Sequence, residues 1–306
     1  MSIVICKLPK SGLGNQLFPL MHAMVFAHIN QMPLKIIGYH QFKIGPYLRN
    51  EKSKRNYLGY FRFQKSIAGE LIDRLICQYF LFKYTINAEP ALIKLNKVEK
   101  KNIAFIFSIL PSYNDYFVHL REHRKLVIDL INSSLSSVIK RKLFQAESSA
   151  IGVHIRMGDF KKLIKQEEFL GGHVRTPEEY FVSIINEIRL FVGFEIAISV
   201  FTDGYKEEFH LLTNLSNVSF IDSKNDMVDL LSLSKCRLIV TSQGSTYSYW
   251  ASFISDAAVV HHPKHIHSIF GKENNGNYEG YLNMNNPLLL SKLELIKNEY
   301  LMKVNS

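Results

Sequence analysis

The sequence is poor in cysteine and has no long apolar run, and both absences narrow the class of protein. It contains 3 cysteines among 306 residues, an odd number at widely separated positions. This spacing excludes a disulfide framework and is typical of proteins from a reducing compartment. No apolar stretch approaches the roughly 18 residues that a membrane-spanning helix requires. Internal repeats and low-complexity tracts are also missing, and a hydrophobic content of 47% excludes intrinsic disorder.

The N-terminus lacks the features of a secretory signal peptide. Residues 2–6 indicate a first β-strand that runs directly into a glycine-containing turn. We therefore expect a cytoplasmic protein, with peripheral contact to the inner face of the cell membrane as a further expectation. The net charge of +10, from 37 basic and 27 acidic residues, suits nucleic acid, anionic lipid headgroups or phosphorylated substrates. Because the basic residues are scattered, most of them are expected on a solvated surface.

Length and the order of apolar segments predict a two-domain α/β protein. At roughly 150 residues per domain, 306 residues accommodate two domains. In the second half, strands are expected near 151–156, 196–201, 217–221, 237–240 and 257–261, and helices near 177–190, 205–213, 225–235, 245–255 and 292–303. This alternation predicts a parallel, doubly wound sheet. We assign residues 1–147 to an N-terminal α/β domain and residues 148–306 to a C-terminal domain with a closing helix.

The first half has a weaker pattern. We expect strands over 2–8 and 104–110 and helices over 17–29, 67–82 and 126–144. Between the first strand and helix lies the turn Ser11–Gln16, which contains Gly12 and Gly14. Strand, Gly-x-Gly and helix bring backbone amides and a helix N-terminus to a ligand. The third glycine of the dinucleotide fingerprint is replaced by Leu17, so a plain structural turn is the alternative.

Three predicted strands of the second half end in polar residues. Arg156 ends the first, with Asp159 close behind it. Asp203 follows the second, and the hydroxyl-rich turn 241–246 follows the third. Because ligands of open α/β sheets bind at the carboxyl ends of strands, one anionic, nucleotide-like ligand is expected to contact all three. The alternative for Arg156 alone is an ion pair with Asp159 that only closes a strand end.

The sequence offers no convincing metal site. Four histidines lie at 261, 262, 265 and 267, but Pro263 interrupts any helix that would align them and no cysteine is near. An Asp-x-Asp pair after a strand is also missing. We therefore expect neither a metal nor another cofactor. An aromatic cluster of Tyr113, Tyr116 and Phe117 is expected in a cleft or, more simply, in the core.

Four motifs occur in an order that resembles the bacterial α-1,2-fucosyltransferases, a glycosyltransferase family 11-like group. They are Gly12–Phe18, His154–Phe160, Phe201–Gly204 and Ser242–Trp250. The resemblance implies a GT-B-type α/β fold, in which two Rossmann-like, doubly wound domains face a cleft and the C-terminal one binds a GDP-sugar. It also implies metal-independent, inverting transfer of L-fucose from GDP-β-L-fucose. The implied acceptor is a galactoside 2-OH, in a free or lipid-linked glycan of surface polysaccharide or O-antigen synthesis.

The resemblance also implies roles for individual residues. Arg156 would bind the diphosphate and stabilise the departing GDP, and Asn15 would face the reacting centre. Asp159, Glu167 and Glu168 are candidates for the proton acceptor by nearness alone, and Asp159 is counted with Arg156 and Asn15 as catalytic. The donor-binding set is Gly14, His154, Arg156, Asp203, Ser242, Gly244, Ser245 and Thr246.

The motifs depart from the family at two places. Met157 stands where relatives often carry a second arginine, and Gln243–Trp250 replaces a segment that often reads Asn-Ser-Thr-Phe-Ser-Trp-Trp. Two alternatives stay open: a transferase that uses another nucleotide sugar, and a non-catalytic basic protein that binds nucleic acid or another anion. No basic-aromatic recognition motif supports a nucleic-acid partner, and we expect none.

Overall fold

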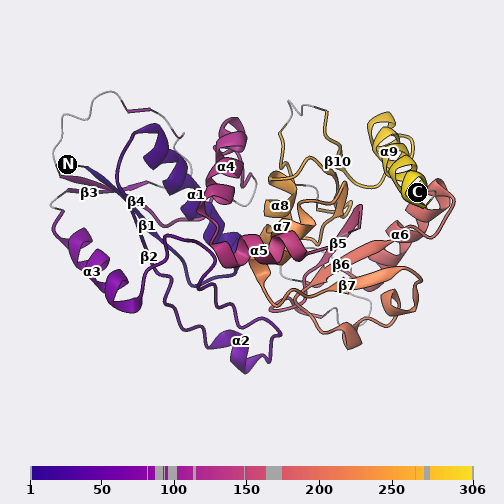
Figure 1. The fold of residues 1–306 in the computed structure, drawn as a ribbon, viewed down its shortest axis with the longest axis horizontal. Helices are drawn as coiled ribbons and strands as arrows, with labels where there is room; N and C mark the ends of the chain where they lie inside the picture. Colours follow the sequence, from indigo (N-terminus) through magenta and orange to yellow (C-terminus); the bar gives the residue numbers. More distant parts are fainter. Residues whose placement is uncertain are drawn as a thin grey trace. The chain divides into compact units, whose positions relative to one another are not determined.

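The computed structural model describes residues 2–80, 82–86, 92, 94–95, 102–112, 115–147, 149–162, 174–265, 267–271 and 276–304. The chain forms two compact units (Figure 1). Unit 1 comprises Met1–Lys43 and Arg55–Arg141, and unit 2 comprises Ile44–Lys54 and Lys142–Ser306. Each unit contains one parallel sheet, which confirms the predicted α/β class. The domain boundary between residues 147 and 148 stays a prediction.

The sheet of unit 1 has four parallel strands in the order β2-β1-β4-β3. The strands are β1 (Ile3–Lys7), β2 (Leu34–Ile37), β3 (Phe82–Ile86) and β4 (Ile103–Phe107). Helix α1 (Leu13–Ile29) contacts β1 and β4, and α3 (Ile67–Gln78) contacts β2. From Leu13 to Ala27, every residue of α1 except Asn15 is buried. The predicted buried helix is therefore confirmed, and Leu17 in the third-glycine position packs in the core.

The sheet of unit 2 has six strands in the order β10-β9-β8-β5-β6-β7, and all neighbours are parallel. The strands are β5 (Ile151–Ile155), β6 (Ile198–Thr202), β7 (Val218–Ile221), β8 (Leu238–Val240), β9 (Ala258–Val260) and β10 (Glu279–Gly280). Counted from β5, this is the 3-2-1-4-5-6 order of a Rossmann sheet. The strand order reverses between β5 and β8, and the carboxyl ends of these two parallel strands form the place where such sheets bind ligands.

Helices connect the strands of unit 2 and bury their apolar faces against the sheet. They are α6 (Glu178–Val192), α7 (Asp226–Leu233), α8 (Thr246–Phe253) and the closing α9 (Pro287–Val304). The side chain of Asn225 caps α7 by accepting from the amides of Met227 and Val228, both at 3.1 Å. Gly152 lets α7 approach β5, because a Cβ there would lie 2.6 Å from Cδ1 of Leu233 and 2.7 Å from Sγ of Cys236.

Two expected helices differ from the structure. The stretch 205–213 forms two 3-10 turns, Lys206–Glu208 and Leu212–Asn214, so the predicted α-helix is wrong. Glu208 completes a capping box at the start of the first turn by accepting from the Tyr205 amide at 3.0 Å, whereas Glu178 of α6 accepts from the Leu212 amide at 2.8 Å and starts the second turn separately.

The predicted helix 126–144 is two helices, α4 (Arg124–Ser134) and α5 (Ser137–Gln145), separated by Leu135 and Ser136. Leu135 is not helical because its backbone forms an isolated bridge with Phe61. The remaining short helix, α2 (Gly45–Leu48), lies in a stretch for which no element was expected. Tyr113, Glu167 and Glu168 lie outside the described residues.

Replacing Gly152 with valine tests the packing of β5 against α7. We expect the free energy of unfolding to fall by about 1–3 kcal/mol, because the added methyl groups overlap buried side chains of α7. Chemical denaturation measures the change. Ser219→Val, at an exposed position of β7 in the same sheet, is the control and should change stability by no more than about 0.5 kcal/mol. Equal stability of the two variants would contradict this packing.

Candidate functional site

The predicted site residues of unit 2 gather where the carboxyl ends of β5 and β8 lie side by side. Arg156 directly follows β5, and Ser242 lies two residues beyond β8. The Arg156 amide donates to Oγ of Ser242 at 2.8 Å, and this hydroxyl donates to the carbonyl of His154 at 2.9 Å. Ser242 is almost fully buried. Its hydroxyl therefore joins the two strand ends, a role that the sequence did not indicate.

The Arg156 guanidinium forms ion pairs with two aspartates. Nη2 contacts Oδ1 of Asp159 at 2.6 Å, and Nη1 contacts Oδ2 of Asp203. Asp203 also accepts from the Met157 amide at 2.7 Å, so it fixes both the backbone and the side chain after β5. The Asp159 carboxylate is the more exposed of the two. The ion pair between Arg156 and Asp159, which was the alternative to ligand binding, is present. Asp203 forms a second and less exposed ion pair with the same guanidinium.

Two motif glycines allow the loops after β5 and β6 to approach one another. A Cβ on Gly158 would lie 2.5 Å from Oδ2 of Asp203. A Cβ on Gly204 would lie 2.7 Å from Cγ of Met157. Glycine is therefore required at both positions by the close contact between the loops that carry Arg156 and Asp203.

His154 is buried beneath an aromatic ring. Its imidazole stacks on Tyr247, with centroids 4.9 Å apart and an interplanar angle of 26°. Burial lowers the pKa of His154 to about 3, and the neighbouring Asp203 only partly offsets this effect. The imidazole is thus neutral near pH 7, and its Nδ1 has no hydrogen-bond partner among the described residues. The Tyr247 hydroxyl in turn donates to the carbonyl of Asp226 at 2.7 Å, which links α8 to α7.

The turn after β8 delivers the N-terminus of α8. Gly244 has φ 61°, and its amide donates to the Tyr249 hydroxyl at 2.9 Å. Ser245 is the N-cap residue of α8, and no cap hydrogen bond involves its side chain. Ser245 is buried, and Thr246 is half-buried. Because the first amides of a helix lack partners within it, this turn favours an anion.

Two residues of the site were missed by sequence reasoning. Tyr247 was part of a quoted motif, but nothing in the sequence showed that it covers His154. Gln243 is buried, and neither atom of its amide has a partner among the described residues. Buried polar groups without an obvious partner are a signal of function only once the fold is known.

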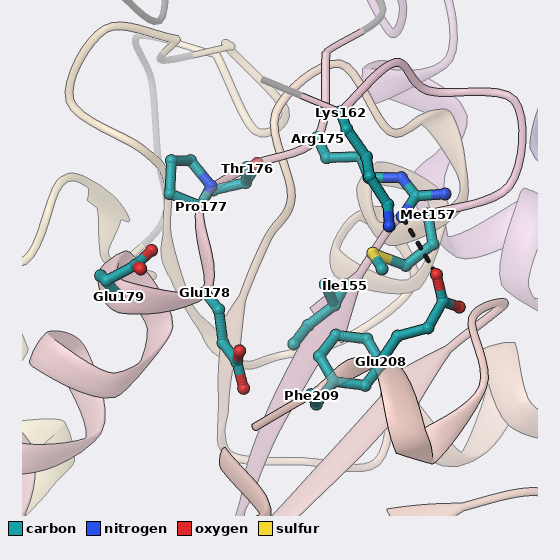
Figure 2. A pocket seen from close by; sticks show the side chains of 10 residues that line it. All are labelled: Ile155, Met157, Lys162, Arg175, Thr176, Pro177, Glu178, Glu179, Glu208 and Phe209. Carbon is teal, nitrogen blue, oxygen red and sulfur yellow. Dashed lines mark hydrogen bonds and ion pairs between the residues drawn. The ribbon is translucent and has the colours of Figure 1, made fainter. Parts of the chain in front are cut away.

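A small cavity adjoins the Arg156 loop (Figure 2). Its volume is about 240 Å³, below the roughly 300–1,000 Å³ of most ligand pockets. Arg175 and Glu208 form an ion pair of 3.2 Å at its wall, and Met157 lies beside them. Met157 is nearly buried here, so the residue that replaces the second arginine of relatives supplies an apolar wall.

Gly14 and Asn15 lie in unit 1, in the first turn of α1. The neighbouring Gln16 is explained by packing, since its side-chain amide donates to the carbonyl of Pro9 at 2.9 Å. Asn15 is half-buried at a position where the surrounding helix is buried. The proposed roles of Gly14 and Asn15 stay predictions.

His261, the first histidine after β9, contacts neighbouring side chains of its own unit. Nδ1 of His261 lies 2.9 Å from Oγ1 of Thr241, and Nε2 lies 3.4 Å from Glu279. Within the described parts of the chain, no group of three or more histidine, cysteine or acidic side chains could hold a metal ion. Metal independence remains a prediction for experiment.

Comparison with known proteins gives a family match. Residues 52–279, more than half of the chain, match the model of glycosyl transferase family 11. No curated protein matches the sequence. Similar solved structures include the NodZ α-1,6-fucosyltransferase co-crystallized with GDP, at 13% identity and a TM-score of 0.48 over 85% of this chain and 95% of that one. POFUT1 in complex with GDP has 12% identity and a TM-score of 0.48, covering 92% and 97%. A mutant of Arabidopsis thaliana FUT1 in complex with GDP has 11% identity and a TM-score of 0.47, covering 87% and 72%.

The buried neutral imidazole of His154 predicts a pH-dependent stability. Its folded pKa of about 3 lies below the ordinary 6.5, so the unfolded chain binds the proton first as pH falls. The stability is complete above about pH 6.5 and is lost at up to about 1.4 kcal/mol per pH unit below it. In His154→Gln, the slope of unfolding free energy against pH between 6 and 4 should therefore be smaller by about that amount.

Chemical denaturation at several pH values measures this slope. His28→Gln is the control, because His28 is exposed near the end of α1. An unchanged slope in His154→Gln would contradict a buried neutral imidazole.

Proposed function

The chain belongs to glycosyl transferase family 11, and from this premise we propose that it transfers L-fucose from GDP-β-L-fucose to a sugar hydroxyl with inversion. The proposed acceptor is the 2-OH of a galactoside, which gives an α-1,2 linkage. The proposed setting is surface polysaccharide or O-antigen synthesis in a bacterial cytoplasm, on a glycan that is lipid-linked at the inner membrane face. The motif order and the family match support the donor class.

One observation carries the proposal: Arg156 stands at the switch point of a Rossmann sheet, next to the N-terminus of α8. When the sugar–phosphate bond breaks, negative charge develops on the diphosphate. A fixed guanidinium and the first amides of α8 supply positive charge without a metal ion. Fixed donors aimed at developing charge are usually the largest single contribution to catalysis.

The two aspartates make different contributions to this chemistry. Asp203 contacts the Arg156 guanidinium and the Met157 amide, so it orients the guanidinium toward the diphosphate. Asp159 makes an exposed ion pair, and exposed pairs contribute only about 0–1 kcal/mol. A diphosphate can therefore replace Asp159 on the guanidinium at small cost. This exchange frees the Asp159 carboxylate, and of the three candidates we propose Asp159 as the acceptor of the proton from the sugar hydroxyl.

The other predicted residues complete the donor and acceptor sides. Ser245 and Thr246 bring their hydroxyls and the first amides of α8 to phosphate oxygens, and Gly244 shapes the turn before them while its own amide donates to the Tyr249 hydroxyl. His154 supports the nucleotide as a neutral ring stacked on Tyr247. Gly14 and Asn15 contribute from the first turn of α1, with Asn15 at the reacting centre.

A transferase with another nucleotide sugar is the alternative within enzymes. Release of nucleotide from a set of sugar donors separates the two, because only the proposed function requires GDP. The non-catalytic alternative gains no support from the structure, since a scattered positive charge does not explain an arginine held by two aspartates at a switch point.

Replacing Arg156 with lysine tests the proposed function. Lysine keeps the charge but loses the planar fork that holds two oxygens at once. We expect kcat for GDP-fucose to fall by about a hundredfold or more, the usual loss for one transition-state donor, while the melting temperature changes little. The measurement is the initial rate of GDP release in the presence of an acceptor galactoside.

Arg121→Lys is the matched control. Arg121 also pairs with an aspartate, Asp115, and its side chain has the same 19% exposure as that of Arg156. This variant should lose the same small amount of stability and retain full activity. If a folded Arg156→Lys protein kept a nearly normal kcat, the role proposed for Arg156 would be wrong.

A further inference from the structure

Helix α3 of unit 1 carries its acidic residues inside and its apolar residues outside. Its buried residues are Glu70, Asp73 and Cys77. Six large apolar side chains are exposed, and we call them the α3 surface: Ile67, Leu71, Ile72, Leu75 and Ile76 of the helix, and Tyr79 just beyond it. Leu71 is 55% exposed and Leu75 is 56% exposed. A helix at the surface of a soluble protein normally has the opposite arrangement.

Hydrogen bonds fix this orientation of the helix. Glu70 accepts from the amides of Gly38 at 2.8 Å, Tyr39 at 3.1 Å and His40 at 3.2 Å. Burial alone would raise the pKa of Glu70, but these bonds and Arg74 outweigh it and hold the pKa below its ordinary value.

Asp73 is held in the same manner. It contacts Nζ of Lys35 at 2.9 Å and Nζ of Lys65 at 2.7 Å. Burial raises its pKa, and the two lysines more than offset this effect. Rotation of α3 to bury its apolar side would leave both carboxylates without their partners, which is strongly unfavourable. The exposed α3 surface is therefore imposed by the fold.

The charges around the α3 surface are predominantly positive. Between residues 60 and 86 the only carboxylates in the sequence are Glu70 and Asp73, and both are buried. Arg62, Lys65, Arg74 and Lys83 are exposed in the same stretch, and since Lys65 and Arg74 pair with Asp73 and Glu70, the stretch retains a net charge of about +2 from Arg62 and Lys83. An apolar stripe with exposed cations beside it, and with no exposed acid in the stretch, is the composition of a helix that lies in a membrane interface. Anionic headgroups attract such cations by about 1 kcal/mol each.

Length and charge argue against other occupants. With 12 residues and a rise of roughly 1.5 Å per residue, α3 cannot cross a hydrocarbon core about 30 Å thick. None of the helices among the described residues is long and apolar enough to span a membrane. A second copy docked on the same surface would face identical cations, and the whole chain carries +10.

We infer that the α3 surface binds the face of an anionic phospholipid bilayer, with α3 lying parallel to it. The purpose of this binding rests on the proposed function, because the bilayer would bring the enzyme to a lipid-linked acceptor. The binding itself requires no turnover.

Co-sedimentation of the full-length protein with vesicles tests the inference. Vesicles of phosphatidylcholine with phosphatidylglycerol should bind the protein, and vesicles of phosphatidylcholine alone should bind much less. In Leu71→Gln/Leu75→Gln the partition coefficient should fall at least about tenfold, because two side chains no longer enter the apolar region. Arg62→Gln should lower it about fivefold, the loss of one cation near an anionic surface.

The control is Phe144→Gln/Leu190→Gln, which alters two exposed apolar residues of unit 2 at 92% and 84% exposure. It should leave the partition coefficient unchanged, and both double variants should melt as the wild type does. Transfer to a soluble galactoside should also be unaffected by Leu71→Gln/Leu75→Gln. If the wild type itself did not transfer fucose to the soluble galactoside, the proposed function would be contradicted, but the vesicle-binding result would still hold.

Three results would overturn the inference. The wild type could fail to sediment with anionic vesicles. The control could lose as much binding as the α3 variant, which would assign the contact to general apolar exposure. Sedimentation velocity could show that the wild type is a dimer and Leu71→Gln/Leu75→Gln a monomer, which would assign the α3 surface to a second copy of the chain.

Discussion

The contacts of one carboxylate, Asp203, determine the geometry of the site in unit 2. It pairs with the Arg156 guanidinium and accepts from the Met157 amide, so a residue after β6 fixes the chain after β5. Gly158 and Gly204 are required because a Cβ at either would strike the other loop. The hydroxyl of Ser242 adds the end of β8 to this arrangement. The three strand ends thus form one rigid edge, and a rigid edge can hold an arginine in the geometry that leaving-group stabilisation requires.

The arrangement of charge explains how an arginine with two acidic partners can serve an anionic ligand. A guanidinium has five N–H donors, and the two aspartates do not occupy all of them. Asp203 is the less exposed partner and is also tied to the backbone, whereas the Asp159 pair is open to solvent. Exchange of the exposed partner for a phosphate costs little, and the orientation set by the other partner persists. Under the proposed function, Asp203 orients the guanidinium and Asp159 is the partner that the ligand replaces, a difference that the sequence alone does not reveal.

Much of the fold followed from the sequence because the strands of unit 2 are short, apolar and separated by helical segments. The expected strand near 151–156 is β5, and the polar residues at three strand ends lie together as parallel topology requires. The helix over 205–213 was wrong because the Glu178 carboxylate, 33 residues before Leu211 in the sequence, binds the backbone amides of Leu211 and Leu212 in the middle of this stretch. Such long-range capping leaves no local pattern.

The site was harder to predict than the fold. Ser242 belongs to a hydroxyl-rich turn in sequence, yet its burial and its two hydrogen bonds make it a structural link. The stacking of Tyr247 on His154 joins residues 93 positions apart, and no pattern in one sequence encodes it. The inverted polarity of α3 has the same origin. Its helical spacing was visible, but only the contacts of Glu70 with Gly38, Tyr39 and His40 show which side faces inward.

A crystal structure of the GDP complex tests whether the diphosphate of a guanine nucleotide binds at Arg156. We expect diphosphate oxygens within hydrogen-bonding distance of the Arg156 guanidinium and of the amides at the start of α8. We also expect the Arg156–Asp159 pair to open while the Arg156–Asp203 pair persists. A diphosphate bound away from Arg156, with both ion pairs intact, would contradict the role proposed for Arg156.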